Sequence, residues 1–371
     1  MAYAEMILFI AKSLTISSDI KNIKEVKNII KSKDFNFDLF VKISTSQLIL
    51  PALYCNYQRL DLLKYFPKEL LTYMKYITDC NRDRNQKIIK QAHEINNVLI
   101  SKGIKPIFLK GTSNLLQGLY EDLAERMIGD IDFLVSADQF QNTINILLKN
   151  NYGLVSNVGY DSPSFKHYPR VIKKDRIAAV EIHKEMIIEK YSGEFDYDTI
   201  KNQIISHKGF SFLGLNHQKV LSIFSFQIND NGFEYKSVNL RSAYDVLLLS
   251  KKSLNLDYIT EFDVLQKTIN CFLITSHYLF GEIDSINFNQ TKFAENYLNS
   301  FKKLLFSPLR QKINSEFIRL KIFAKQRLKI IFKSFVQKEY RIWLIKRICD
   351  KNWQREKLVQ LKLKKPLQKE L

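Results

Sequence analysis

The sequence predicts an α+β protein, and two observations support that fold class. The stretch from Ile104 to Val135 has the pattern of a strand, a glycine turn, a helix and a second strand. By contrast, apolar residues recur at helical spacing through most of the chain before and after that stretch. We therefore expect a small sheet in the middle of the chain, with helical regions on both sides.

Residues 1–95 are expected to form an N-terminal helical region. Apolar residues there follow three- and four-residue steps, as at Ile23, Val26 and Ile30. The longest helix is predicted from about 67 to 102, and Gly103 is expected to close it as a C-cap. This pattern indicates core packing and carries no functional prediction.

Residues 96–205 are expected to form the α+β core. Strands are predicted at about 105–110, 130–136, 167–173 and 177–186, with a hairpin turn at 174–176. The helix after the first strand is expected to begin at Thr112 or Ser113, either of which can cap it, and Asp138 is expected to cap the helix after the second. From about His207 to Ser300 the pattern is helical again, so residues 206–300 are expected to form a helical region that packs on the core.

Two aspartates in the second predicted strand, Asp130 and Asp132, indicate a metal site. Residues two apart in a strand share a face, so both carboxylates point to one place while Ile131 and Phe133 point into the core. Two carboxylates held side by side repel each other unless a cation lies between them, and oxygen ligands suit Mg²⁺ or Mn²⁺. A second Asp-x-Asp at 196–198 lies in a polar stretch and is interpreted as a solvated loop.

Positive charge is concentrated near the C-terminus. The chain has 57 Lys and Arg against 38 Asp and Glu, a net charge of +19. Residues 301–371 hold 21 Lys and Arg against 5 Asp and Glu, which gives a net charge of +16 and leaves +3 for residues 1–300. Apolar residues in this tail follow three- and four-residue steps at Ile313, Phe317, Leu320, Ala324, Leu328, Ile331 and Phe335. We therefore predict that residues 301–371 form a basic amphipathic helix or helix pair.

Three interpretations of this tail remain open. Lys and Arg interleaved with aromatic residues could bind RNA phosphates and stack on bases. The same composition suits an amphipathic helix that lies on an anionic membrane surface. The third interpretation is a solvated basic face on helices that cap the core.

Cysteine usage and hydropathy bear on the compartment. The four cysteines are far apart and form no Cys-x-x-Cys pair, so they fit neither a disulfide framework nor a zinc site. We therefore expect the protein in a reducing cytosol. No apolar stretch is long enough to span a bilayer, and the first fifteen residues lack the pattern of a signal peptide. We expect a cytoplasmic protein, or one bound at the inner face of the membrane.

Five short motifs, in this order and spacing, resemble an uncharacterised bacterial nucleotidyltransferase family of the DNA polymerase β-like superfamily. They are Leu109-Lys110-Gly111, Leu119-Tyr120, Arg126, Asp130-Ile131-Asp132 and Glu181-Ile182-His183. The resemblance covers about residues 85–250 and implies a small mixed β-sheet with flanking helices. It also implies a catalytic metal site formed by Asp130, Asp132 and Glu181, and a turn at 111–112 that meets the nucleotide phosphates.

Transfer of a nucleotidyl group depends mainly on positioning and charge neutralisation. Divalent cations would activate the attacking hydroxyl and stabilise the leaving pyrophosphate, and three carboxylates are the usual minimum to hold them. Gly111 allows close approach of the backbone to phosphate, and Thr112 or Ser113 could donate a hydroxyl hydrogen bond. Lys110 and Arg126 are the nearest candidate cations for the triphosphate.

Each of these residues also has a structural interpretation. Gly111 could serve only the turn, Lys110 could be a solvated strand end, and Arg126 could pair with one of the acids at 121, 122 and 125. Glu181 could lie on the surface, with Asp175 as the third ligand instead. His183, two residues from Glu181, is expected to orient a carboxylate or to pack. Arg241 and Asp245 resemble a pair found in the family, and their spacing suits an intrahelical ion pair. Gln227 stands near the place where the family carries a histidine.

We therefore expect a Mg²⁺- or Mn²⁺-dependent nucleotidyltransferase that moves a nucleoside monophosphate from a nucleoside triphosphate to a hydroxyl. The acceptor could be a sugar, another small molecule, RNA or a protein. The alternative is a catalytically silent protein of the same fold that uses its basic tail to bind RNA or a membrane surface.

Overall fold

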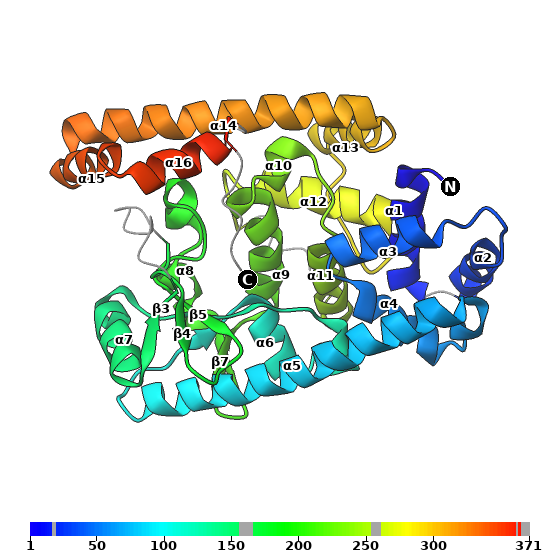
Figure 1. Cartoon of the computed structure of the whole chain (residues 1–371), viewed down its shortest axis with the longest axis horizontal. Coiled ribbons are helices and arrows are strands. Elements are labelled where there is room, and N and C mark those ends of the chain that lie inside the picture. The colour runs from blue at the N-terminus through cyan, green and yellow to red at the C-terminus, as the bar shows by residue number, and fades with distance from the viewer. Residues whose placement is uncertain (17–19, 156–165, 254–260, 361–362, 365–371) are drawn as a thin grey trace.

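The computed structural model describes residues 1–16, 20–155, 166–253, 261–360 and 363–364. Within these ranges the chain has an α+β fold, with one seven-stranded mixed sheet and helices on its flanks, as predicted (Figure 1). The strands are β1 (Ile107–Phe108), β2 (Asp130–Leu134), β3 (Tyr152–Leu154), β4 (Val171–Lys173), β5 (Ala179–His183), β6 (Ile204–His207) and β7 (Phe210–Leu213). Their order in the sheet is β3-β4-β5-β2-β1-β7-β6.

The centre of the sheet is formed by β5, β2, β1 and β7. The pairs β2–β5 and β1–β7 are parallel, whereas β1–β2 is antiparallel. On one face of β2 and β5, Ile131, Phe133 and Val180 are completely buried in the core. Because side chains alternate along a strand, the opposite face of these strands is left for Asp130, Asp132 and Glu181.

The N-terminal part of the chain is helical, as predicted. Its elements are α1 (Tyr3–Leu14), α2 (Ile20–Ile30), α3 (Phe37–Ser46), α4 (Leu50–Arg59), the short 3₁₀ helix η2 (Leu63–Tyr65) and α5 (Lys68–Ile100). The 33-residue α5 runs past the sheet along one side of the molecule (Figure 1). Gly103, with φ of +76°, follows its end, and the amide of Ile104 bonds to the carbonyl of Leu99. The predicted role of Gly103 in closing this helix is confirmed.

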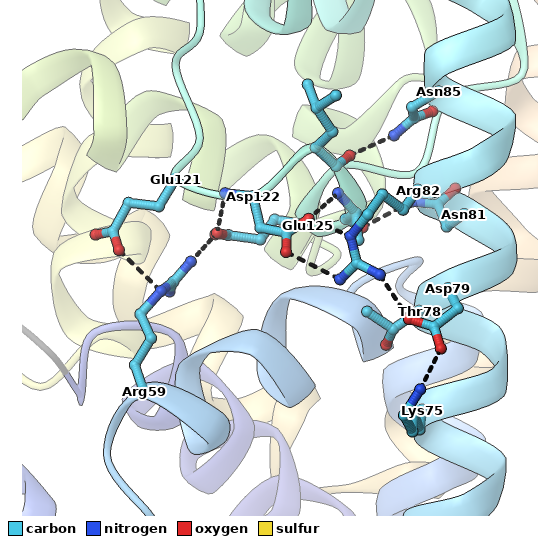
Figure 2. Close-up of polar contacts among 12 residues, drawn as sticks. Arg59, Lys75, Thr78, Asp79, Asn81, Arg82, Asn85, Glu121, Asp122 and Glu125 are labelled. Atoms are coloured by element: carbon cyan, nitrogen blue, oxygen red, sulfur yellow. Dashed lines mark hydrogen bonds and ion pairs between the residues drawn. The ribbon is translucent and has the colours of Figure 1, made fainter.

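A polar network joins α5 to the connection that leads into β2 (Figure 2). Arg82 Nε and Nη2 bind the two carboxylate oxygens of Asp122 at 3.0 and 2.9 Å. The side-chain amides of Asn81 and Asn85 donate to the carbonyl oxygens of Ala124 and Arg126 at 2.7 and 2.8 Å. These bonds satisfy backbone groups that are cut off from water, and they fix the segment immediately before the two aspartates.

The helices around the sheet are α6 (Lys110–Leu116), η3 (Leu123–Glu125), α7 (Ala137–Lys149), η4 (Glu189–Glu194), α8 (Tyr197–Ile200) and η5 (Lys201–Gln203). The two helices for which caps were predicted, α6 and α7, begin one to three residues before those caps. The N-cap of α6 is Leu109, so the prediction that Thr112 or Ser113 caps it is wrong. Asp138 lies in the first turn of α7, whose N-cap is Ser136, so that prediction is also wrong.

The prediction of helix from about residue 207 is wrong at its start, because β6 and β7 form a hairpin there. Lys208 and Gly209 both have positive φ, +49° and +79°, and they join His207 to its partner Phe210. Two central residues with positive φ are typical of a type I′ turn, whose usual Asn-Gly or Asp-Gly signal is absent here. The predicted hairpin between β4 and β5 is confirmed, although both strands are shorter than expected.

The remaining elements are helical. They are α9 (Leu215–Phe224), the π-helical turn η6 (Ser225–Asn229), α10 (Gly232–Tyr235), α11 (Leu240–Lys252), α12 (Gln266–Leu279) and α13 (Lys292–Leu305). The basic tail follows as α14 (Pro308–Val336), α15 (Lys338–Ile348) and α16 (Lys351–Gln360), three helices where one or two were predicted. The 29-residue α14 lies along the side of the molecule opposite to α5 (Figure 1). In the described ranges, every helix is too short or too polar to cross a membrane.

Candidate active site

Two parallel strands bring the acidic residues together. In the register of β2 and β5, Asp132 lies beside Glu181, Asp130 beside Ala179, and Leu134 beside His183. Side chains at these positions share one face of the sheet. The topology therefore places Asp130, Asp132, Glu181 and His183 on a single face, although β2 and β5 are about fifty residues apart in sequence.

His183 lies directly against the carboxylates of Asp132 and Glu181. Its Nε2 is 2.9 Å from Asp132 Oδ1 and 3.3 Å from Glu181 Oε2, and the imidazole is fully buried. One ligand atom from each of these three residues lies within 4.8 Å of the others. Such a cluster has the size and the ligand types of a divalent metal site.

The hydrogen bond on the other side of the His183 ring supports this fit. Nδ1 is 3.2 Å from the carbonyl oxygen of Glu185, which can only accept, so Nδ1 carries a proton. In a neutral imidazole, Nε2 then has a lone pair that faces two carboxylates, which also only accept. A cation between these three groups, either a proton or a metal ion, resolves the conflict. A carbonyl that orients a histidine through its second nitrogen is common at metal centres.

Lys110 supplies positive charge to the same cluster. Its Nζ lies 2.6 Å from Asp132 Oδ1 and 3.9 Å from Glu181 Oε2. Burial opposes the charge on Lys110, but the charges of Asp132 and Glu181 outweigh burial and raise its pKa. Lys110 has a φ of +52°, a left-handed conformation that is unfavourable for a residue with a side chain. Lys110, the first residue of α6, is therefore held in a strained conformation while its ammonium binds Asp132.

Arg170, from the segment before β4, binds the remaining acid. Its Nη2 lies 2.9 Å from Asp130 Oδ2, and its Nε lies 2.7 Å from Glu181 Oε1. In this arrangement Asp130 turns toward Arg170 and lies outside the compact group formed by Asp132, Glu181 and His183. Arg170 was missed in the sequence analysis, because only the register of β4 and β5 places it beside Glu181.

The carboxylates differ in how readily they ionise. Burial opposes ionisation of Asp132, yet Lys110 and His183 hold its pKa well below the ordinary value. Burial also opposes ionisation of Glu181, but the hydrogen bond with His183 and the charge of Lys110 lower its pKa to about 2. The pKa of Asp130 is raised by burial, which Arg170 offsets only in part. Asp132 and Glu181 are therefore charged at neutral pH, as metal ligands must be.

The predicted phosphate-binding turn is tightly packed. A Cβ atom at Gly111 would lie 2.3 Å from Ile128 Cγ2, so glycine is required at this position for packing. Thr112 Oγ1 donates to the carbonyl of Asp130 at 3.2 Å, and Ser113 Oγ accepts from Gln117 Nε2 at 2.7 Å. Both hydroxyl groups are buried. The structure thus places Gly111, Thr112 and Ser113 beside β2, and a role in phosphate binding stays a prediction.

Arg126 is buried in a different ion pair from those expected. Its Nε lies 3.0 Å from both carboxylate oxygens of Asp245, and its Nη2 lies 2.7 Å from Oδ2. Tyr120 also donates to Asp245. Asp245 is therefore taken by Arg126 and not by Arg241, and the expected intrahelical pair does not form. The Arg126 guanidinium lies next to Gly111, so it supports the turn from behind.

Asp175, the alternative third ligand, is exposed in the β4–β5 turn, where the neighbouring Arg176 pairs with Glu94 of α5.

Two further charged residues, Lys166 and Asp230, lie near the acidic cluster. Burial and the charge of Lys110 lower the pKa of Lys166 to about 8. Burial raises the pKa of Asp230, against the opposing charges of Lys166 and Lys110. Neither residue belongs to a sequence motif, and only the fold brings them here.

Arg241, on α11, is a further basic residue close to Arg126. Its guanidinium donates to the carbonyl of Met127 at 3.4 Å, and burial together with the charge of Arg126 lowers its pKa to about 10. Among the residues that the structure describes, neither Lys166 nor Arg241 forms an ion pair.

Comparison with known proteins identifies one family. A family model described as "Uncharacterised nucleotidyltransferase" matches residues 33–279, which contain the sheet and every candidate site residue. Neither the curated proteins nor the solved structures contain a significant match.

Proposed function

The chain belongs to this uncharacterised nucleotidyltransferase family, and on that premise we propose that it transfers a nucleoside monophosphate from a nucleoside triphosphate to a hydroxyl of an acceptor. The observation that carries the proposal is the group formed by Asp132, Glu181 and His183, whose ligand atoms converge on one point. The motif order, with a glycine turn before Asp-x-Asp and a later acid, supports membership of the DNA polymerase β-like superfamily.

Asp132, Glu181 and His183 would hold a divalent cation, and Asp130 on the same strand face would complete the set of ligands. The bound cation would neutralise phosphate charge and lower the pKa of the attacking hydroxyl. Two carboxylates with an imidazole suit Mn²⁺ at least as well as Mg²⁺, because imidazole favours transition metals over Mg²⁺. The carbonyl of Glu185 orients His183 for this role.

Basic side chains around the cluster are suited to the triphosphate. Lys110 binds Asp132, and the charges of Lys110, Glu181 and Asp132 all act on the pKa of Lys166. Both lysines could therefore contact phosphate oxygens beside the acidic cluster. Gly111 and Thr112 would contribute backbone amides at the start of α6, whereas the amide of Ser113 already donates to the carbonyl of Leu109 at 3.2 Å. Arg126, whose guanidinium is engaged by Asp245, would position this turn and not bind phosphate directly.

One observation favours the alternative, a catalytically silent protein of the same fold. Each acidic residue of the cluster already has a cationic partner within the chain: Arg170 for Asp130, Lys110 for Asp132 and Arg170 for Glu181. A protein that needs no metal could satisfy its carboxylates in this way. The two functions make opposite predictions for metal and nucleotide binding.

The test is transfer of label from each nucleoside triphosphate in the presence of Mg²⁺ or Mn²⁺, with heat-treated cell extract as a source of acceptor. We expect transfer and pyrophosphate release with at least one nucleotide, and at least a hundredfold loss in Asp132→Asn and Glu181→Gln. Asp198→Asn is the matched control, since Asp198 belongs to the other Asp-x-Asp and is exposed beside Lys201. Absence of transfer with every nucleotide, together with no heat of binding, would favour the silent alternative.

A further inference from the structure

A row of apolar residues on α14 faces solvent. Large apolar side chains recur along this helix and are between 44% and 75% exposed. We call this row the α14 stripe, and it consists of Leu309, Ile313, Phe317, Leu320, Leu328, Ile331 and Phe335. Its members are the same residues whose spacing predicts an amphipathic helix, but the fold turns them outward.

The stripe is continuous. Its residues follow three- and four-residue steps, with exposed Ala324 filling the step between Leu320 and Leu328. At 1.5 Å per residue, the row from Leu309 to Phe335 is about 40 Å long. Two residues of α14, Ile318 and Ser334, are buried against the protein, and neither belongs to the stripe. Figure 1 shows α14 along one side of the molecule, with α13, α15 and α16 beneath it.

The next helix extends the same feature. On α15, Ile342, Ile345 and Ile348 are each more than half exposed, while Tyr340 and Trp343 are buried. Isolated apolar side chains are normal on protein surfaces, but a long continuous row indicates an interaction site. Two adjoining helices with outward apolar rows therefore need an apolar partner.

The charge beside the stripe is strongly positive. α14 contains eight Lys or Arg and one acid, Glu316, which is paired with Arg319. Lys312 and Lys325 are exposed between the stripe residues, whereas Lys321 binds Glu234 of α10 at 3.1 Å. On the inner side, Lys333 and Lys329 bind Glu189 at 2.6 and 3.1 Å, which fastens α14 to the segment that follows β5.

We propose that α14 lies on a membrane surface that carries anionic lipids, with the α14 stripe among the acyl chains and the lysines at the headgroups. An apolar row flanked by cations matches both parts of such a surface. RNA would satisfy the lysines but would leave the aliphatic side chains in water. A second copy would bring two helices of the same strong positive charge together, which is unfavourable.

The experiment is flotation of the full chain with vesicles of phosphatidylcholine alone or of phosphatidylcholine mixed with phosphatidylserine. We expect binding to the anionic vesicles, weakened by salt, and at least tenfold weaker in the double variant Phe317→Gln/Leu328→Gln. Leu148→Gln/Val264→Gln is the control, because it removes two exposed apolar side chains elsewhere and should bind like the wild type. Circular dichroism confirms that both variants fold, since all four positions are exposed.

Three outcomes would overturn the proposal. Failure to float with anionic vesicles would exclude the membrane surface. Binding that is unchanged in the stripe variant would show that the stripe is not the contact. A dimer in light scattering that the stripe variant dissociates, without vesicle binding, would assign the stripe to a second copy of the chain.

Discussion

His183 faces hydrogen-bond acceptors on both sides of its ring, and this makes it the most informative residue of the site. The carbonyl of Glu185 fixes the proton on Nδ1, and Nε2 is left facing Asp132 and Glu181. The sequence predicted Asp132 and Glu181 from alternation and resemblance, but His183 was expected to orient a carboxylate or to pack. Its place among the ligand atoms follows from the β2–β5 register, which sequence spacing alone does not determine.

The lowered pKa of Glu181 predicts how stability depends on pH. Its pKa in the fold is about 2, below its ordinary value of 4.5, so Glu181 stabilises the fold above about pH 4.5 and loses this contribution as the pH falls toward 2. Glu181→Gln should therefore remove about 3 kcal/mol of the fall in the unfolding free energy between pH 4.5 and pH 2. Urea unfolding at a series of pH values measures this. A pH dependence that Glu181→Gln leaves unchanged would contradict the prediction.

The left-handed conformation of Lys110 predicts a difference between two substitutions. Both Lys110→Ala and Lys110→Gly remove the ammonium that binds Asp132. Only glycine removes the Cβ that is unfavourable at a φ of +52°. Lys110→Gly should therefore be more stable than Lys110→Ala by about 1 kcal/mol. Thermal and urea unfolding test this, and equal stability of the two variants would show that no strain is held here.

At the scale of elements, the short helix α6 and the strand β2 are held together from two sides. Ile128 and Arg126 pack against Gly111 on one side, and α5 binds the connecting segment through Asn81, Asn85 and Arg82 on the other. The sequence predicted the strand, turn and helix because these patterns are local. The pairing of Arg126 with Asp245 was not predicted, since the two residues are 119 positions apart and only tertiary packing brings them together.

Gly111→Ala tests this packing. The added Cβ would overlap Ile128 Cγ2, so we expect a loss of about 1–3 kcal/mol in the free energy of unfolding. The cost should be smaller when Ile128 is also changed to Ala, which a double-mutant cycle measures. Gly129→Ala is the control, because a Cβ there meets no atom within 4 Å. Equal effects at Gly111 and Gly129 would contradict this account of the turn.

At the scale of the whole molecule, the fold class was predictable and the sheet order was not. Long helices such as α5 carry their own periodicity, whereas the four-residue strands β6 and β7 are too short to show one. The tail shows a further limit of sequence patterns. Spacing correctly predicted that α14 is amphipathic, but not that its apolar face points to solvent. The spacing of apolar residues shows that a helix has an apolar face, but it does not show what that face contacts.

The central claim is that β2 and β5 together form a metal site for a nucleotide, and a Mn²⁺ titration tests it most directly. Electron paramagnetic resonance would follow free Mn²⁺ with the full chain, in the presence of a non-hydrolysable nucleoside triphosphate. We predict saturable binding by the wild type and by Asp198→Asn, with at least tenfold weaker binding in Glu181→Gln and His183→Gln. Saturable binding that is the same in all four proteins, or no binding by the wild type, would contradict the claim.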